Sequence, residues 1–414
     1  MKLGYRIMKC TGIVLAVIVV LPVFTVSIAI LYWNVRLPPD FTFDPMLDTE
    51  TWVAVPASNN KSIQHNSNTD MIYYQNNFYL IHAQTKWHLQ DKHGALVIQR
   101  STDARQWEEV ARITVPNTDV RDPKFAIIHG QLFLYFLPNW RFDPGPNTTY
   151  WTVSGDGTTW ATPVELTSIT VKYHYDNGTT VDHTSGNWNL WRPKTFDNVS
   201  WYVIAGGRKI DKQMTVLLNS SDGINWEEVS EVYSLYGNGE PELEFTPSHG
   251  IIATLRCGSL GVPGYEFGNP TGNTIIASSE FPYVNWSYSH SFITRLDGST
   301  SFSLDGRIFA VGRNQIGPAV DTGNHLSKKR TAFYEVTREK LIFLFDLPSQ
   351  GDTAYTGVVL KDGQIYASYY TNPMDDNIGD FPWIIGICFQ PKSEIRIARV
   401  SQAGLIAYAD SLQT

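Results

Sequence analysis

One sequence unit recurs six times along the chain, and this repetition limits the fold more than any other feature. Each copy has an apolar segment of strand length, a turn rich in Gly, Asn or Asp, and a second apolar segment. Successive copies start 51, 71, 48, 60 and 53 residues apart, at Asp70, Arg121, Arg192, Glu240, Thr300 and Thr353. Units of about 50 residues that each supply four short strands are typical of propeller blades. The repeats therefore predict an all-β, six-bladed β-propeller.

A second element follows the first three copies and supports this architecture. It is a short turn that ends in tryptophan, at Ser101–Trp107, Ser154–Trp160 and Ser220–Trp226, with a degenerate fourth form that ends at Trp286. Asp and Gly suit a tight turn, and we expect each tryptophan to pack between neighbouring sheets. We interpret this element as a structural staple.

The composition excludes several other classes of protein. Aromatic residues make up 13% of the 414 residues, and charged residues only 17%. Such a chain can bury enough apolar surface to offset its conformational entropy, which excludes disorder, and the composition is not that of a long coiled coil. The net charge is −8 and no basic run stands out. A nucleic acid is therefore not an expected partner.

The start of the chain is a separate part of the sequence. No charged side chain occurs from Cys10 to Trp33, and a helix of that length can cross a hydrocarbon core of about 30 Å. Basic residues precede this run, which places the N-terminus in the cytoplasm. A cleaved signal peptide is the alternative. We expect a single-pass membrane protein, with a cytoplasmic tail at 1–9, a transmembrane signal anchor at 10–33, a linker and first strand at 34–60, and an extracytoplasmic propeller at 61–414.

The tryptophan turns resemble the Asp boxes of the sialidase (neuraminidase) superfamily. The pattern Ser-x-Asp-Gly-x-x-Trp occurs at Ser154–Trp160 and Ser220–Trp226, and the resemblance extends over residues 60–405. It implies a propeller of the sialidase type with a glycan as substrate or ligand.

The later repeats carry residues in the positions and order of the sialidase catalytic set. Glu240 begins and Arg256 ends the segment EPELEFTPSHGIIATLR, Arg330 begins RTAFYEV, and Tyr355 lies in AYTGVVL. The resemblance implies that Tyr355 is the nucleophile and Glu240 its base. It also implies that Arg256 and Arg330 bind the carboxylate of the substrate, a task for which the arginine fork is suited. Tyrosine nucleophiles are the sialidase exception among glycosidases.

The first repeat departs from the family pattern. Sialidases have an Arg-Ile-Pro step at this point, whereas this chain has NTDMIYY, with Asp70 and no arginine. Arg121 in VRDPK or Arg192 in LWRPK could substitute from a neighbouring blade. The family's acid/base Asp lies in a loop of the first blade, and Asp91 is the best positional match.

Two other functions stay open. The step Arg121-Asp122-Pro123 also resembles the Arg-Asp-Pro step of invertase-like furanosidases. In a five-bladed enzyme of that kind, Asp122 would stabilise the transition state and Glu240 or Glu242 would be the acid. The second alternative is a non-catalytic propeller that binds a glycan or a protein, which the missing first arginine favours.

Some residues are expected to lie outside the site. Arg208 and Arg313 end hairpins and are interpreted as rim residues. No cofactor and no metal site is expected, because His65, His82 and His88 show no metal-like pairing in the sequence.

Overall fold

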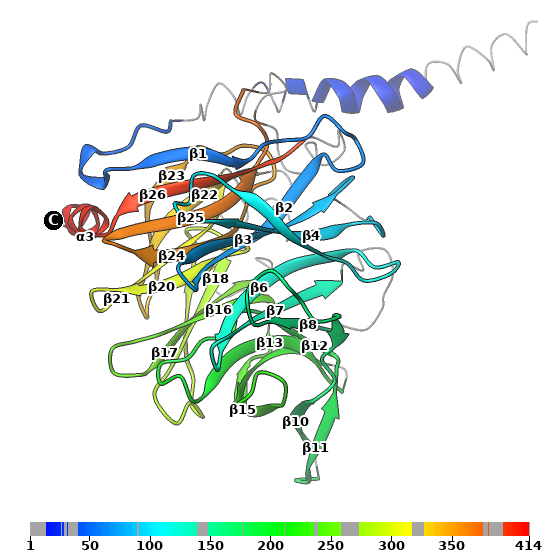
Figure 1. The fold of residues 1–414 in the computed structure, drawn as a ribbon, viewed down its shortest axis with the longest axis vertical. Coiled ribbons are helices and arrows are strands. Elements are labelled where there is room, and N and C mark those ends of the chain that lie inside the picture. Colours follow the sequence, from blue (N-terminus) through cyan, green and yellow to red (C-terminus); the bar gives the residue numbers. More distant parts are fainter. Residues whose placement is uncertain are drawn as a thin grey trace, which may run out of the picture.

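The computed structural model describes residues 14–25, 27–28, 31, 40–88, 91–138, 148–175, 177–210, 212–235, 239–257, 273–316, 327–375, 380 and 392–413. These residues form six antiparallel sheets around one axis (Figure 1). Each sheet contacts the next one along the chain, and the last contacts the first. The six-bladed propeller predicted from the repeats is confirmed, and the five-bladed alternative is wrong.

The strands of the first, second, fourth and fifth sheets follow the chain in order, from the axis to the rim. The first blade consists of β2 (His65–Tyr74), β3 (Asn77–Thr85), β4 (Ala95–Ser101) and β5 (Glu108–Ile113). The second consists of β6 (Val120–Ile128), β7 (Gln131–Pro138), β8 (Tyr150–Ser154) and β9 (Val164–Glu165). The fourth consists of β16 (Gly239–Phe245), β17 (Ile251–Cys257), β18 (Asn273–Ser279) and β19 (Ser287–Ser291). The fifth consists of β20 (Thr300–Leu304), β21 (Arg307–Ile316), β22 (Lys328–Val336) and β23 (Leu341–Leu347).

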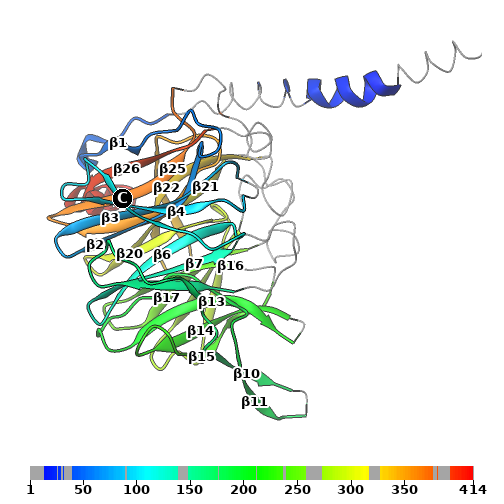
Figure 2. The same ribbon diagram turned by 45° about the vertical axis from the view of Figure 1, so that its right-hand side comes forward.

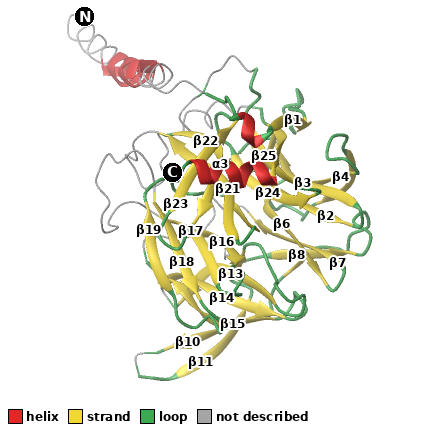
Figure 3. Ribbon diagram, turned by 90° about the vertical axis from the view of Figure 1, so that its left-hand side faces the viewer, coloured by secondary structure: helices red, strands yellow, loops and turns green. Residues whose placement is uncertain are grey.

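The third blade carries an additional hairpin. Its four main strands are β12 (Trp188–Leu190), β13 (Trp201–Lys209), β14 (Lys212–Ser220) and β15 (Trp226–Tyr233). The hairpin of β10 (Ile169–His174) and β11 (Thr180–Ser185) joins this sheet through a parallel pairing of β10 with β15, and its tip projects from the body (Figure 3). The insertion accounts for the long spacing of 71 residues between the second and third repeats.

The sixth blade is built from both ends of the propeller sequence. It contains β24 (Ala354–Lys361), β25 (Gln364–Thr371) and β26 (Glu394–Ser401), and its outermost strand is β1 (Glu50–Val55). The pairing places Glu50 opposite Arg399. The short 3-10 helix η1 (Pro45–Leu47) precedes β1, and α3 (Gln402–Ser411) follows β26 and packs on η1.

The Asp-box turns lie at strand ends. The turn at Ser220–Trp226, between β14 and β15, shows their structural role. Asp222 accepts hydrogen bonds from the backbone N–H groups of Ile224 and Asn225, both at 2.8 Å. The indole N–H of Trp226 donates to the carbonyl of Gly223 at 3.0 Å. The Trp226 ring is buried in the apolar cluster between the second and third blades.

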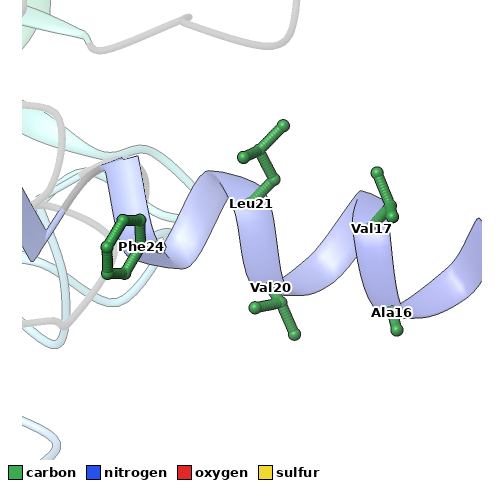
Figure 4. Close-up of a pocket in the computed structure, with 5 residues that line it drawn as sticks. All are labelled: Ala16, Val17, Val20, Leu21 and Phe24. Atoms are coloured by element: carbon green, nitrogen blue, oxygen red, sulfur yellow. The ribbon is translucent and has the colours of Figure 1, made fainter. Parts of the chain in front are cut away.

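A helix near the start of the chain lies apart from the sheets (Figure 2). It is described over residues 14–25, and its apolar side chains are exposed, including Val17, Val20, Leu21 and Phe24 (Figure 4). Within the described part of the chain, no helix is long and apolar enough to span a membrane. The predicted anchor at 10–33 lies partly outside the described residues.

Candidate active site

Four inner strands share an irregularity at the same point. The strand register slips in β2, β6, β16 and β24, and each slip contains a non-glycine residue with φ of 44° to 50°, namely Asn68, Asp122, Glu240 and Tyr355. A bulge with one residue in the left-handed region turns a side chain out of the regular alternation. Such backbone conformations cost free energy and gather at functional sites.

The side chains at these bulges meet across the blades. The hydroxyl of Tyr355 donates to Glu240 Oε1 at 2.5 Å, and the amide of Asn68 donates to Asp122 Oδ1. The charges of Glu240 and Asp122 both act on the Tyr355 hydroxyl. The four bulges therefore form one polar cluster at the axis.

A glycine in the fifth blade makes room for this cluster. Gly298 has φ of +57°, and its backbone N–H donates to Glu240 Oε2 at 2.8 Å. A Cβ at this position would lie 2.6 Å from Cγ of Tyr355. The absence of a side chain at Gly298 lets the Tyr355 ring pack against the backbone beside Glu240.

Two arginines flank the tyrosine. Arg256 forms an ion pair with Glu240, and its side chain is 36% exposed. Arg313 lies with its guanidinium 5.4 Å from the centre of the Tyr355 ring. Its contacts are internal, because Nε donates to the carbonyl of Thr353 at 2.8 Å and one terminal nitrogen donates to Asp352 at 2.9 Å. Arg256 is thus the flanking arginine with more surface open to a ligand.

The environment keeps the phenol of Tyr355 protonated. Burial raises its pKa well above the usual value, and the charges of Glu240 and Asp122 act in the same direction. The charges of Arg256 and Arg313 oppose this shift without reversing it. Tyr355 can become a nucleophile only if a neighbouring base takes its proton as the reaction proceeds, and Glu240 is in hydrogen-bonding contact with that proton.

The pKa of the Asp122 carboxyl group is higher than usual. Burial raises its pKa, Lys124 opposes the shift, and the charge of Glu240 adds to it. A carboxyl group with a raised pKa can serve as a proton donor.

Other charged residues on or next to the inner strands are buried and pair with one another. Arg192 is buried, with an ion pair to Asp70 and a second to Glu242 at 3.3 Å. It also donates to Thr300 Oγ1 at 2.9 Å. Arg192, predicted to bind substrate, is therefore held in a structural layer that links the first, third, fourth and fifth blades.

Asp91 and Arg121 belong to a loop network beside the first and second blades. Asp91 accepts the backbone N–H of His93 at 3.0 Å, and its own N–H donates to Asp119 at 2.9 Å. Arg121 is buried and pairs with the same Asp119 at 2.9 Å. The structure uses both residues to hold this loop and does not bring them into the contacts of Tyr355.

Arg330 has a different partner from the one expected. It is 2% exposed and forms an ion pair with Asp380, which also pairs with Lys328 at 3.1 Å. The place near Tyr355 that was expected for Arg330 is taken by Arg313, which the sequence had assigned to the rim. The signal that could have found Arg313 is its place near the end of the second strand of the fifth blade, because that strand, β21, contacts β24, which carries Tyr355.

Comparisons with solved structures show the same fold. A Trypanosoma rangeli sialidase in complex with 2,3-difluorosialic acid, described as a covalent intermediate, matches with a TM-score of 0.59 and 12% identity, over 87% of this chain and 60% of that one. The phage phi92 endosialidase matches with a TM-score of 0.59 and 9% identity, over 88% and 71%. A Dyadobacter fermentans protein of unknown function matches with a TM-score of 0.56 and 16% identity, over 85% and 99%.

These matches define the class of fold. The chain is a six-bladed propeller of the sialidase type, as the Asp boxes predicted, and the low identities mark it as divergent. It spans about 60% of the length of the trypanosomal sialidase chains. No protein-family model matches the chain, and no curated protein matches its sequence.

Proposed function

We propose that the chain is a sialidase-like glycoside hydrolase that acts on a glycan with Tyr355 as nucleophile. The observation that carries the proposal is the contact between the Tyr355 hydroxyl and Glu240 Oε1 at 2.5 Å, with Arg256 on the same carboxylate. A neutral nucleophile suits a sugar whose anomeric carbon bears a carboxylate, because a carboxylate nucleophile would be repelled. The Trypanosoma rangeli neighbour is a sialidase seen with sialic acid.

The first step follows from the contacts of Tyr355. As its oxygen bonds to the anomeric carbon, its proton passes to Glu240, and the aglycone oxygen leaves with a proton from Asp122. We assign the proton donor to Asp122 because its pKa is raised and its charge reaches Tyr355. Asp91, the donor predicted from the sequence, caps its own loop instead.

The second step reverses these roles. Asp122, now ionised, takes a proton from water as the water oxygen bonds to the anomeric carbon. The bond to Tyr355 breaks and the tyrosine recovers its proton from Glu240. Two displacements at one carbon give net retention of configuration. Arg256 holds the substrate carboxylate through charge-assisted hydrogen bonds.

A fluorinated sialic acid tests the proposal directly. Incubation of the full chain with 2,3-difluorosialic acid should add the mass of the sugar to the peptide that contains Tyr355. The Tyr355→Phe variant should remain unlabelled. Labelling of a carboxylate residue instead would exclude the tyrosine mechanism, and an unlabelled wild-type chain that turns over no sialoside would exclude the enzyme.

A glycan-binding propeller without catalysis is the second candidate. The observation in its favour is that Arg313 is only 6% exposed and already engaged by Asp352, which leaves Arg256 as the open flanking arginine. A wild-type chain that binds sialylated glycans on an array and hydrolyses none of them would favour this function.

We further propose that residues 10–33 anchor the chain with its propeller outside the cytoplasm. The uncharged run from Cys10 to Trp33 and the basic residues before it support this orientation. Protease added to intact cells should then digest the propeller. Complete protection of the propeller would reverse the orientation.

A further inference from the structure

The strongest unassigned feature is a group of three buried side chains where the sixth blade meets the first. His65 begins β2, His88 follows β3, and Asp352 precedes β24. They are 2%, 5% and 3% exposed. One ligand atom of each lies within 4.8 Å of the others. The residues come from separate parts of the chain, so the sequence showed no metal-like spacing.

The hydrogen bonds of Ser393 determine which nitrogen of His65 carries a proton. Ser393 Oγ donates its single proton to the carbonyl of Asn66 at 2.6 Å. Nδ1 of His65 lies 3.0 Å from that oxygen, and it must therefore be the donor in this contact. In neutral His65 the other nitrogen, Nε2, then presents a lone pair.

That lone pair points at the other two groups. His65 Nε2 lies 3.1 Å from Nδ1 of His88, and the same Nδ1 lies 2.9 Å from Asp352 Oδ2. One proton on Nδ1 would have to serve an imidazole lone pair and a carboxylate oxygen at once. A cation at the centre would instead be bound by all three atoms, with His88 protonated on its other nitrogen.

We propose that His65 Nε2, His88 Nδ1 and Asp352 Oδ2 bind a divalent transition metal of the zinc type. Two imidazoles and a carboxylate are a common zinc ligand set, with a water molecule in the fourth position. The bond from His65 Nδ1 to Ser393 is the second-shell contact that orients such ligands.

The surrounding charges are compatible with this assignment. The two oxygens of Asp352 have different partners. Oδ1 accepts a hydrogen bond from Arg313 at 2.9 Å, and Oδ2 faces the histidines. The carboxylate thus lies between the guanidinium and the proposed cation. Oδ2 also accepts from the hydroxyl of Tyr370 at 2.6 Å, which fixes its direction.

The metal would cross-link two blades of the propeller. It would join the first blade, through the two histidines, to Asp352, two residues before β24 begins. Because Asp352 also binds Arg313, the same metal site would hold that arginine beside Tyr355. The role is a positioning one and does not depend on the reaction at Tyr355.

Zinc analysis of the full chain, purified in detergent without a histidine tag, tests the site. We expect one zinc per chain by plasma mass spectrometry and a Tm that rises with added ZnCl₂ and falls with a chelator. His65→Asn and His88→Gln should each weaken zinc binding at least about tenfold. His93→Gln, an exposed histidine of the same loop region, should bind zinc as the wild type does.

A second measurement uses only the wild-type chain, so that the test does not depend on whether the variants fold. Cobalt(II) added to the wild-type chain should give the intense visible bands of a tetrahedral site, and zinc should abolish them. The proposal would be overturned if the wild-type chain bound no zinc, gave no cobalt spectrum and showed no Tm shift. It would also be overturned if both variants folded and bound zinc as tightly as the wild type. Sialoside hydrolysis is measured separately, so that failure of the metal proposal and failure of the proposed glycosidase function can be distinguished.

Discussion

The hydroxyl of Tyr355 lies 2.5 Å from Oε1 of Glu240, although the two residues are 115 positions apart and belong to different blades. Both are bulge residues with positive φ, 48° for Tyr355 and 44° for Glu240. The contact therefore depends on two strained backbones that point their side chains toward the same axis. The strain is concentrated where the two blades bring their polar groups together, as is common at functional sites.

Removal of the hydroxyl at position 355 should abolish turnover and leave the fold intact. Tyr355→Phe keeps the ring, which packs near Trp191 and Tyr370, and loses one hydrogen bond worth about 1 kcal/mol. We expect kcat on a fluorogenic sialoside to fall by about 10³-fold or more, as for loss of a nucleophile. A kcat within threefold of the wild-type value would show that another group attacks the sugar.

Conservative changes at two arginines should show which of them binds the substrate carboxylate. The sequence assigned this role to both Arg256 and Arg330, whereas the structure places only Arg256 beside Glu240. Arg256→Lys keeps the charge but loses the fork, which should raise KM for a carboxylated substrate about 10- to 100-fold. Arg330→Lys, which can still pair with Asp380, should change KM little. The reverse order of effects would restore Arg330 as the carboxylate binder.

The neutral variant of Asp122 should gain stability while it loses activity. The folded state raises the pKa of this carboxyl group because it is buried, so folding disfavours its ionised form at neutral pH. Asp122→Asn should therefore unfold at a higher Tm than the wild type near pH 7. The difference should fade as the pH falls below about 4, where the carboxyl group is protonated in both states.

Activity measurements complete the test of Asp122. Asp122→Asn should lower kcat by about 10²- to 10⁴-fold with a poor leaving group, and less with an activated aryl aglycone that needs no protonation. An equal loss with both substrates would argue against a proton donor at this position.

A methyl group at Gly298 should displace Tyr355. The added Cβ of Gly298→Ala would lie 2.6 Å from Cγ of the tyrosine, and a shift of about 1 Å at a reacting group costs on the order of 100-fold in rate. The positive φ should add about 1–3 kcal/mol of strain. Gly306→Ala is the matched control, because it has φ of +76° and only Pro247 at 3.5 Å. It should lose stability but keep kcat.

The sequence predicted the blades well because repetition is a property of the whole chain. The six apolar hairpins specify six sheets whatever the loops contain, and the order Glu240, Arg256, Tyr355 could be read from their positions in those hairpins. The inserted hairpin of β10 and β11 was visible only as a long spacing. In β11 the one apolar residue, Val181, is exposed, so the alternation that marks a strand was weak there.

The individual partners of charged residues could not be predicted in the same way. Arg313 and Arg330 are both on neighbouring strands of the fifth blade, and their register places Asn314 opposite Arg330. Which of them reaches Tyr355 depends on the direction of each side chain and on the carboxylates nearby, Asp352 and Asp380. The contact of His88 with Asp352 likewise requires the sixth blade to close onto the first.

Because β1 is the outer strand of the sixth blade, the order of synthesis matters for folding. β1 leaves the ribosome early and has no sheet to join until β26 has been made near the other end of the sequence. Pairings between distant parts of a chain form slowly, and an unpaired strand edge invites association with other chains. Premature termination before Glu394 would leave β1 without its neighbour and expose the edge of β25.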